Sequence, residues 1–110
     1  MEDRHFLHFN TACFTYYDGA EVFYKLKIGE VLELIAEPEN RFDPYAATVY
    51  FKIYKLGYIP HDKNKGIYNF LLLGHNDIFI ARINNIIENE IPEKQIGVTV
   101  KIKAKASITT

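Results

Sequence analysis

The chain has 110 residues, of which 48% are hydrophobic and 25% charged, and its formal net charge is -1. This composition indicates one folded domain over residues 1–110, and it excludes both a disordered segment and a second domain with its own core. The near-neutral charge also excludes a dedicated non-specific DNA binder, because such proteins gain affinity from an excess of positive charge.

The sequence shows no sign of secretion or of membrane insertion. The one cysteine cannot form a disulfide within the chain. The N-terminus begins with acidic residues and leads into no signal-peptide core, and the apolar run 70–73 is too short to span a bilayer. We therefore expect a cytoplasmic protein without membrane association.

The first third of the chain has strand-like and turn-like segments. Residues 6–17 predict a first strand and its exit, and Asp18-Gly19 predicts a turn. The stretch 22–28 fits a short helix or an extended connection equally well. Residues 31–36 alternate apolar and polar side chains, which predicts a half-buried strand.

The remainder predicts four more strands and one helix. Period-2 alternation predicts strands at 47–54, 78–87 and 96–106, with a short return strand at 55–59. A helix is expected at 62–73. We therefore expect a mainly β protein with a helical insertion, folded as a small, partly closed antiparallel β-barrel.

The predicted helix has recognisable ends. Asp62 is suited to the N-cap position, and Gly74 to the position just after the last turn. Gly66 within it costs about 1 kcal/mol relative to alanine.

The loop 37–47 between two predicted strands contains two prolines, which stiffen it. Asn40 and Asp43 can bond nearby backbone N–H groups and fix its turns. Phe42 between them is either a core anchor or an exposed platform on which a nucleobase stacks, with a carboxylate beside it to accept hydrogen bonds. The residues alone leave both readings open.

Three motifs in order resemble the HIRAN domain: Tyr16-Tyr17-Asp18-Gly19, the loop 37–47, and Gly57-Tyr58-Ile59-Pro60 before a helix. The resemblance covers residues 7–87, with the strand 96–106 following. It implies an OB-like or SH3-like β-barrel with a helical insertion. It also implies a DNA-binding module, found in helicase-like chromatin remodellers and as a stand-alone bacterial protein. The best-known eukaryotic member holds the 3′-hydroxyl end of single-stranded DNA.

The resemblance assigns roles to particular residues. It implies that Tyr16 and Phe42 stack bases, that Asp43 accepts a hydrogen bond from the terminal hydroxyl, and that His61 or Lys63 contacts phosphate. Arg41 and Lys63 lie nearby in the sequence and could supply part of the positive charge. The complete candidate nucleic-acid site therefore consists of Tyr16, Tyr17, Asn40, Arg41, Phe42, Asp43, Tyr58, His61 and Lys63.

The sequence also departs from the family pattern. Thr15 and Ala36 stand where the family often has arginine, and His61 is a residue type that is mostly neutral at pH 7. The stacking and end-reading groups remain while the electrostatic contacts are reduced. The alternative function is therefore a protein-interaction or assembly domain that keeps the HIRAN fold without binding DNA.

Two further surfaces carry charge. One is the outward face of the 47–54 strand, where Tyr50 and Tyr54 flank Lys52. It fits either strand-to-strand packing or single-strand binding. The other is the row Lys101, Lys103 and Lys105, which fits either a phosphate track or an edge strand protected from aggregation.

Catalytic and metal-binding patterns are absent from the sequence. His5 and His8 should lie on opposite faces of a strand, and Cys13 is expected to be a small buried apolar residue. We therefore expect a protein that is not an enzyme and holds no cofactor or metal. A hydrolase or nuclease would need a metal-bound carboxylate cluster. The expected partner is single-stranded DNA or a DNA end, in DNA repair, with a helicase or nuclease supplying the chemistry.

Overall fold

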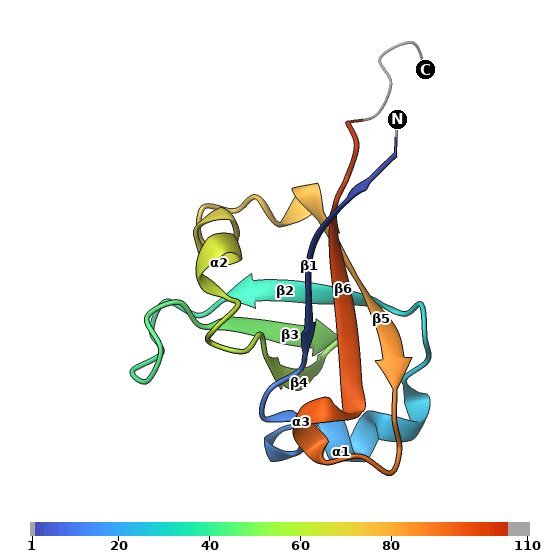
Figure 1. Ribbon diagram of the computed structural model, residues 1–110. Coiled ribbons are helices and arrows are strands. Elements are labelled where there is room, and N and C mark those ends of the chain that lie inside the picture. Colours follow the sequence, from blue (N-terminus) through green and yellow to red (C-terminus); the bar gives the residue numbers. More distant parts are fainter. Residues whose placement is uncertain (1, 106–110) are drawn as a thin grey trace.

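The computed structural model describes residues 2–105, and six strands form one antiparallel sheet in it (Figure 1). The strands are β1 (Arg4–Asn10), β2 (Val31–Ala36), β3 (Ala47–Phe51), β4 (Tyr54–Tyr58), β5 (Phe79–Ile86) and β6 (Ile96–Ile102). Their order in the sheet is β1-β6-β5-β2-β3-β4. The helices are α1 (Gly19–Val22), α2 (Lys65–Leu72) and α3 (Pro92–Gln95), with 3-10 turns at Phe14–Tyr16, Phe23–Lys25 and Asn76–Ile78.

The sheet curls back on itself and almost closes. In Figure 1, β1 and β6 run across β2 and β3, so the two halves of the sheet face each other. The chain just after β1 then meets β4 through an isolated bridge, in which Ala12 and Tyr58 exchange backbone hydrogen bonds of 2.8 and 2.9 Å. This seam joins the two edges of the sheet. The expected fold class, a mainly β and partly closed antiparallel barrel, is confirmed.

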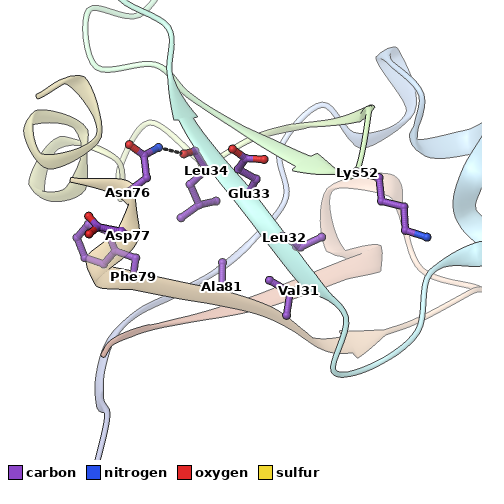
Figure 2. Close-up of a pocket in the computed structure, with 9 residues that line it drawn as sticks. All are labelled: Val31, Leu32, Glu33, Leu34, Lys52, Asn76, Asp77, Phe79 and Ala81. Carbon is purple, nitrogen blue, oxygen red and sulfur yellow. Dashed lines mark hydrogen bonds between the residues drawn. The ribbon is translucent and has the colours of Figure 1, made fainter. Parts of the chain in front are cut away.

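The opposite seam, between β2 and β5, is short. Only Val31–Arg82 and Leu32–Ala81 are paired, and β2 then leaves β5. A cleft of about 540 Å³ lies where they separate (Figure 2). There the Asn76 side-chain amide donates to the Leu34 carbonyl at 2.6 Å, so that a carbonyl at the diverging end of β2 remains hydrogen-bonded.

One apolar core fills the space between the two halves of the sheet. Alternate residues of β5 and β6 point into it, together with one face of α2. Its largest fully buried side chains are Phe14, Leu56, Ile59, Ile67, Ile83, Ile96, Val22, Val49, Val98 and Val100.

The first strand is shorter than predicted, because β1 ends at Asn10 and not near residue 17. Thr11 donates its N–H to Ile96, and Cys13 takes a left-handed conformation with φ of 60° that turns the chain into the 3-10 segment. The undecided stretch 22–28 contains the end of α1 and the turn Phe23–Lys25.

The predicted strand 47–54 is wrong in its second half. β3 ends at Phe51, Lys52 adopts φ of +55°, and the chain reverses through Lys52 and Ile53 into β4. Two-residue hairpin turns need such positive φ values. Tyr50 is therefore on β3 and Tyr54 on β4, so the two tyrosines and Lys52 do not form one face of a single strand, as both readings of this surface required.

The helix begins three residues later than predicted. Asn64, not Asp62, occupies the N-cap position, and its backbone carbonyl accepts the N–H groups of Ile67 and Tyr68. The C-terminal prediction is confirmed: Gly74 has φ of +87° and donates to Leu71 at 3.1 Å, as expected after the last turn.

The last strand ends at Ile102, so Lys103 and Lys105 follow β6 and are not part of it, and Ala106 lies outside the described residues. β6 also pairs on both sides, with β1 and β5. The edge-strand explanation for the lysine row is therefore wrong.

The two N-terminal histidines lie side by side, contrary to expectation. A β-bulge between His5 and Leu7 shifts the side-chain alternation. The two imidazole ring centroids are consequently 5.4 Å apart. Among residues 2–105 no group of three or more His, Cys, Asp or Glu side chains could hold a metal, and no helix could span a membrane.

Candidate nucleic-acid interface

A pocket of about 340 Å³ opens beside the closing seam of the barrel, between the loop 37–46 and the segment that follows β1. We call it the loop pocket. Its polar and aromatic lining consists of Tyr17, Asn40, Phe42, Asp43, Tyr58 and His61, and the remainder of Ala12, Cys13, Ala46 and Ile59. Six of the nine candidate site residues thus share one cavity.

Hydrogen bonds within the loop hold it in one shape. The Asn40 side-chain oxygen accepts the N–H groups of Phe42 at 2.8 Å and Asp43 at 2.9 Å. The Asp43 carboxylate accepts the N–H of Tyr45 at 2.9 Å. With its backbone anchored in this way, the Phe42 ring is 97% exposed. Phe42 is therefore a displayed platform and not a core anchor.

A buried asparagine fixes the carboxylate of Asp43. Asn64 is fully buried, and its amide donates to Asp43 Oδ2 at 2.8 Å. The Tyr45 N–H occupies the other oxygen, Oδ1. A carboxylate has about four acceptor sites, so each oxygen of Asp43 can still accept one further hydrogen bond from a ligand.

A second network supports the loop from β4. Glu37 accepts hydrogen bonds from Tyr58 at 2.8 Å and from Asn40 at 2.9 Å. It also forms a salt bridge of 3.2 Å with Lys55. The Lys55 ammonium lies 4.3 Å from the ring centroid of Tyr17 and 4.7 Å from that of Tyr58. The wall of the pocket is therefore preorganised by one ion pair under two aromatic rings.

Comparison with known proteins agrees with the fold and names the family. A crystal structure of a protein from Lactobacillus plantarum superposes with a TM-score of 0.75 over 93% of this chain and 97% of that one, at 16% identity. A comparison with curated proteins gave no match. The HIRAN domain family model matches residues 5–105. The chain belongs to the HIRAN family. HIRAN domains are binding modules for single-stranded DNA and its 3′ ends.

Three implied site residues lie outside the loop pocket of this HIRAN domain. Tyr16 is 80% exposed and does not line it, whereas Tyr17, 41% exposed, does. Arg41 is exposed on the loop. Lys63 donates to the backbone carbonyl of His8 at 3.0 Å and so lies against β1.

Sequence reasoning missed four residues that shape or line the pocket. Glu37 and Lys55 are 18 positions apart and meet only because β2 and β4 flank β3. Asn64 lies inside the helix that the sequence predicts at 62–73, whereas in the structure it is the N-cap of α2 and its side chain is free to reach Asp43. Cys13, expected to be buried, is half-buried and lines the pocket. Nothing in the local sequence pattern signals these contacts.

The Glu37–Lys55–Tyr58 network shifts three pKa values. Burial opposes the charge of Glu37, but the hydrogen bonds from Asn40, Tyr58 and Lys55 outweigh it and lower the pKa. Burial also opposes the charge of Lys55, yet its bonds with Tyr58 and Glu37 raise the pKa. Burial raises the pKa of Tyr58 to about 12, with Tyr17 and Glu37 acting in the same direction and Lys55 against it.

We expect the alkaline stability of this HIRAN domain to depend on Tyr58. An unfolded tyrosine ionises near pH 10, whereas folded Tyr58 keeps its proton to about pH 12. Between these values the folded state binds more protons, so the free energy of unfolding falls as the pH rises. Tyr58→Phe has no such ionisable group. The midpoint of its urea unfolding should therefore decline less steeply from pH 10 to 12 than that of the parent protein. Equal slopes in the two proteins would contradict the shift.

Proposed function

We propose that this HIRAN domain binds single-stranded DNA and holds a free 3′-hydroxyl end in the loop pocket. The observation that supports this best is the position of Phe42. Its fully displayed ring borders the same cavity as the Asp43 carboxylate and the Tyr17 ring. An aromatic surface beside an acceptor suits a terminal nucleotide, which offers a base to stack and a hydroxyl to donate.

Each group has a distinct role in this proposal. Phe42 and Tyr17 stack bases, at roughly 1–3 kcal/mol per base. Tyr17 replaces Tyr16 in this role, because it is the one that borders the cavity. Asp43 accepts a hydrogen bond from the 3′-hydroxyl, and Asn40 holds the loop around it. A 3′-phosphate would place negative charge beside this carboxylate and be disfavoured.

The charges around the pocket are consistent with end recognition and not with tight backbone binding. Lys55 is paired with Glu37, so its charge is largely balanced. His61 lines the pocket and Arg41 lies on the loop beside it, and these supply the remaining positive character. The affinity of the loop pocket by itself should therefore depend more on stacking and on the strand end than on ionic strength. Such a module would recruit a partner, a helicase or nuclease, to DNA ends during repair.

Fluorescence anisotropy with matched oligodeoxynucleotides tests the end preference. A 3′-hydroxyl strand should bind about tenfold more tightly than the same strand with a 3′-phosphate, the scale of one charged hydrogen bond. Moving the phosphate to the 5′ end should have little effect, which controls for total charge. Equal affinity for both 3′ ends would contradict the proposal. A folded protein that binds neither strand at low salt would favour the protein-interaction alternative.

A further inference from the structure

A second polar surface lies on the outer side of the β1-β6-β5 half of the barrel. Register places His8, Thr99 and Arg82 opposite one another across the three strands. His5 and Lys101 form a second row with Ile80. Directly paired residues point to the same side of a sheet. The intervening residues Ala81, Ile83, Val98 and Val100 are buried, so the two rows face outward. We call this surface the ladder face.

The ladder face contains a hollow of about 350 Å³ with the chemistry of a phosphate site. It is lined by Arg82, Lys101, Thr99 and Asn84, together with Ile80 and Asp3. The Asn84 amide donates a hydrogen bond to the Thr99 hydroxyl, which can itself still donate to a ligand. The Asp3 carboxylate already accepts the N–H of Ala104 at 2.7 Å. Cationic forks and hydroxyl donors together are the groups that bind phosphate oxygens.

Among the side chains that the structure describes, neither Arg82 nor Lys101 forms an ion pair, and the salt bridge found there joins Lys55 to Glu37. Arg82 donates one N–H to the Gly29 carbonyl at 2.8 Å, which fixes the side chain without neutralising it. Lys101 lies on a strand with neighbours on both sides, so protection of a sheet edge does not account for it. With Asp3 as the carboxylate of the lining, Arg82 and Lys101 leave the hollow with a net positive charge that favours an anion.

A chain of polar residues connects the hollow with the loop pocket. His61 lines the loop pocket, and Lys63, two positions later, bonds the carbonyl of His8 on β1. His8 is in the same cross-strand row as Thr99 and Arg82. With strands about 4.8 Å apart, this row spans about 10 Å. A single strand that leaves the pocket past Lys63 therefore meets β1, the edge strand of the ladder face.

We propose that the ladder face binds the phosphate backbone of the single strand whose end occupies the loop pocket, with Arg82 and Lys101 as the phosphate contacts. This inference rests on the proposed function. It assigns the two sites separate tasks, since the pocket recognises the end and the ladder face adds affinity that grows with strand length and falls with salt.

Strand length separates the two sites experimentally. Anisotropy is measured with 3′-hydroxyl oligodeoxynucleotides of about three and about twelve nucleotides, within and beyond the reach of the pocket alone. Lys101→Gln should weaken binding of the longer strand roughly fivefold, and lower its logarithmic salt slope by about 0.7. Binding of the short strand should be unchanged. Lys101→Arg should restore binding, and Lys52→Gln, on the exposed β3–β4 turn, is the matched control.

The possible outcomes are distinct for the two proposals. The ladder-face proposal is wrong if Lys101→Gln leaves binding of the longer oligonucleotide unchanged, or if it weakens binding of both oligonucleotides equally. If 3′-hydroxyl and 3′-phosphate strands bind equally well while Lys101→Gln still weakens binding of the longer strand, end recognition is wrong. The ladder-face proposal is then still supported. If the folded protein binds neither oligonucleotide, both proposals are wrong. Because Lys101 is exposed, an unchanged unfolding midpoint confirms that each variant is folded.

Discussion

Phe42→Ala is expected to weaken oligonucleotide binding by roughly ten- to a hundredfold while leaving the stability of the domain unchanged. The ring is 97% exposed, so its removal takes no apolar surface out of the core. The lost contact is base stacking, worth roughly 1–3 kcal/mol. The hydrogen bonds that shape the loop use the Phe42 backbone N–H and are retained in alanine. Anisotropy and thermal unfolding on the same samples measure the two effects separately.

A matched control makes this result specific. Tyr24 is 81% exposed and belongs to the turn Phe23–Lys25, away from the loop pocket lining. Tyr24→Ala removes a ring of similar exposure and should leave binding unchanged. Phe42→Trp preserves an aromatic surface and should bind at least as well as the parent. If Phe42→Ala binds normally, stacking on this loop is not the basis of recognition.

Gly57→Ala is expected to destabilise the domain by about 3 kcal/mol or more. Gly57 has φ of +143°, and a Cβ atom there would lie 2.1 Å from the Ala12 backbone oxygen. Backbone strain of this kind costs about 1–3 kcal/mol, and forced overlap in a packed region costs a similar amount. The segment that would have to shift contains Ala12, whose isolated bridge to Tyr58 links the two edges of the partly closed barrel. For a domain near this size the melting temperature should fall by at least about 10 °C.

Gly66→Ala is the control for that substitution. Gly66 is in α2, and a Cβ there would meet nothing within 4 Å. Alanine at this site should be neutral or stabilising by up to about 1 kcal/mol, because it lowers the entropy of the unfolded chain. Folded Gly57→Ala protein should also bind DNA less well, since Ala12 and Tyr58 both line the loop pocket. A Gly57→Ala protein with the parent melting temperature would contradict the closed seam.

In the proposed function, preorganisation of the loop pocket compensates for the nearly neutral charge of the protein. Neither the loop nor the wall formed by Tyr17 and Tyr58 has to be ordered when a strand arrives, because Asn40, Asn64 and Glu37 already hold them. A rigid site loses less conformational entropy on binding. This partly offsets the arginines that the sequence lacks at Thr15 and Ala36.

Local pattern was sufficient for the fold class and for the family. Period-2 alternation located most strands, because a half-buried strand must present one face to the core whatever its partners are. Gly74 marked the end of α2, since positive φ after a helix favours glycine. The order of the three motifs identified the HIRAN domain because each motif is contiguous in the chain.

The tertiary structure determined strand register, hairpin position and strand order, which the alternation of apolar and polar residues does not encode. The bulge in β1 brought His5 and His8 together, the hairpin at Lys52 separated Tyr50 from Tyr54, and two pairing partners made β6 an interior strand. Strand register and order depend on residues distant in sequence, so no local window contains them. For the same reason the sequence supplied Phe42 and Asp43 as candidates, whereas the contacts of Asn64, Glu37 and Lys55 with the loop pocket exist only in the folded barrel.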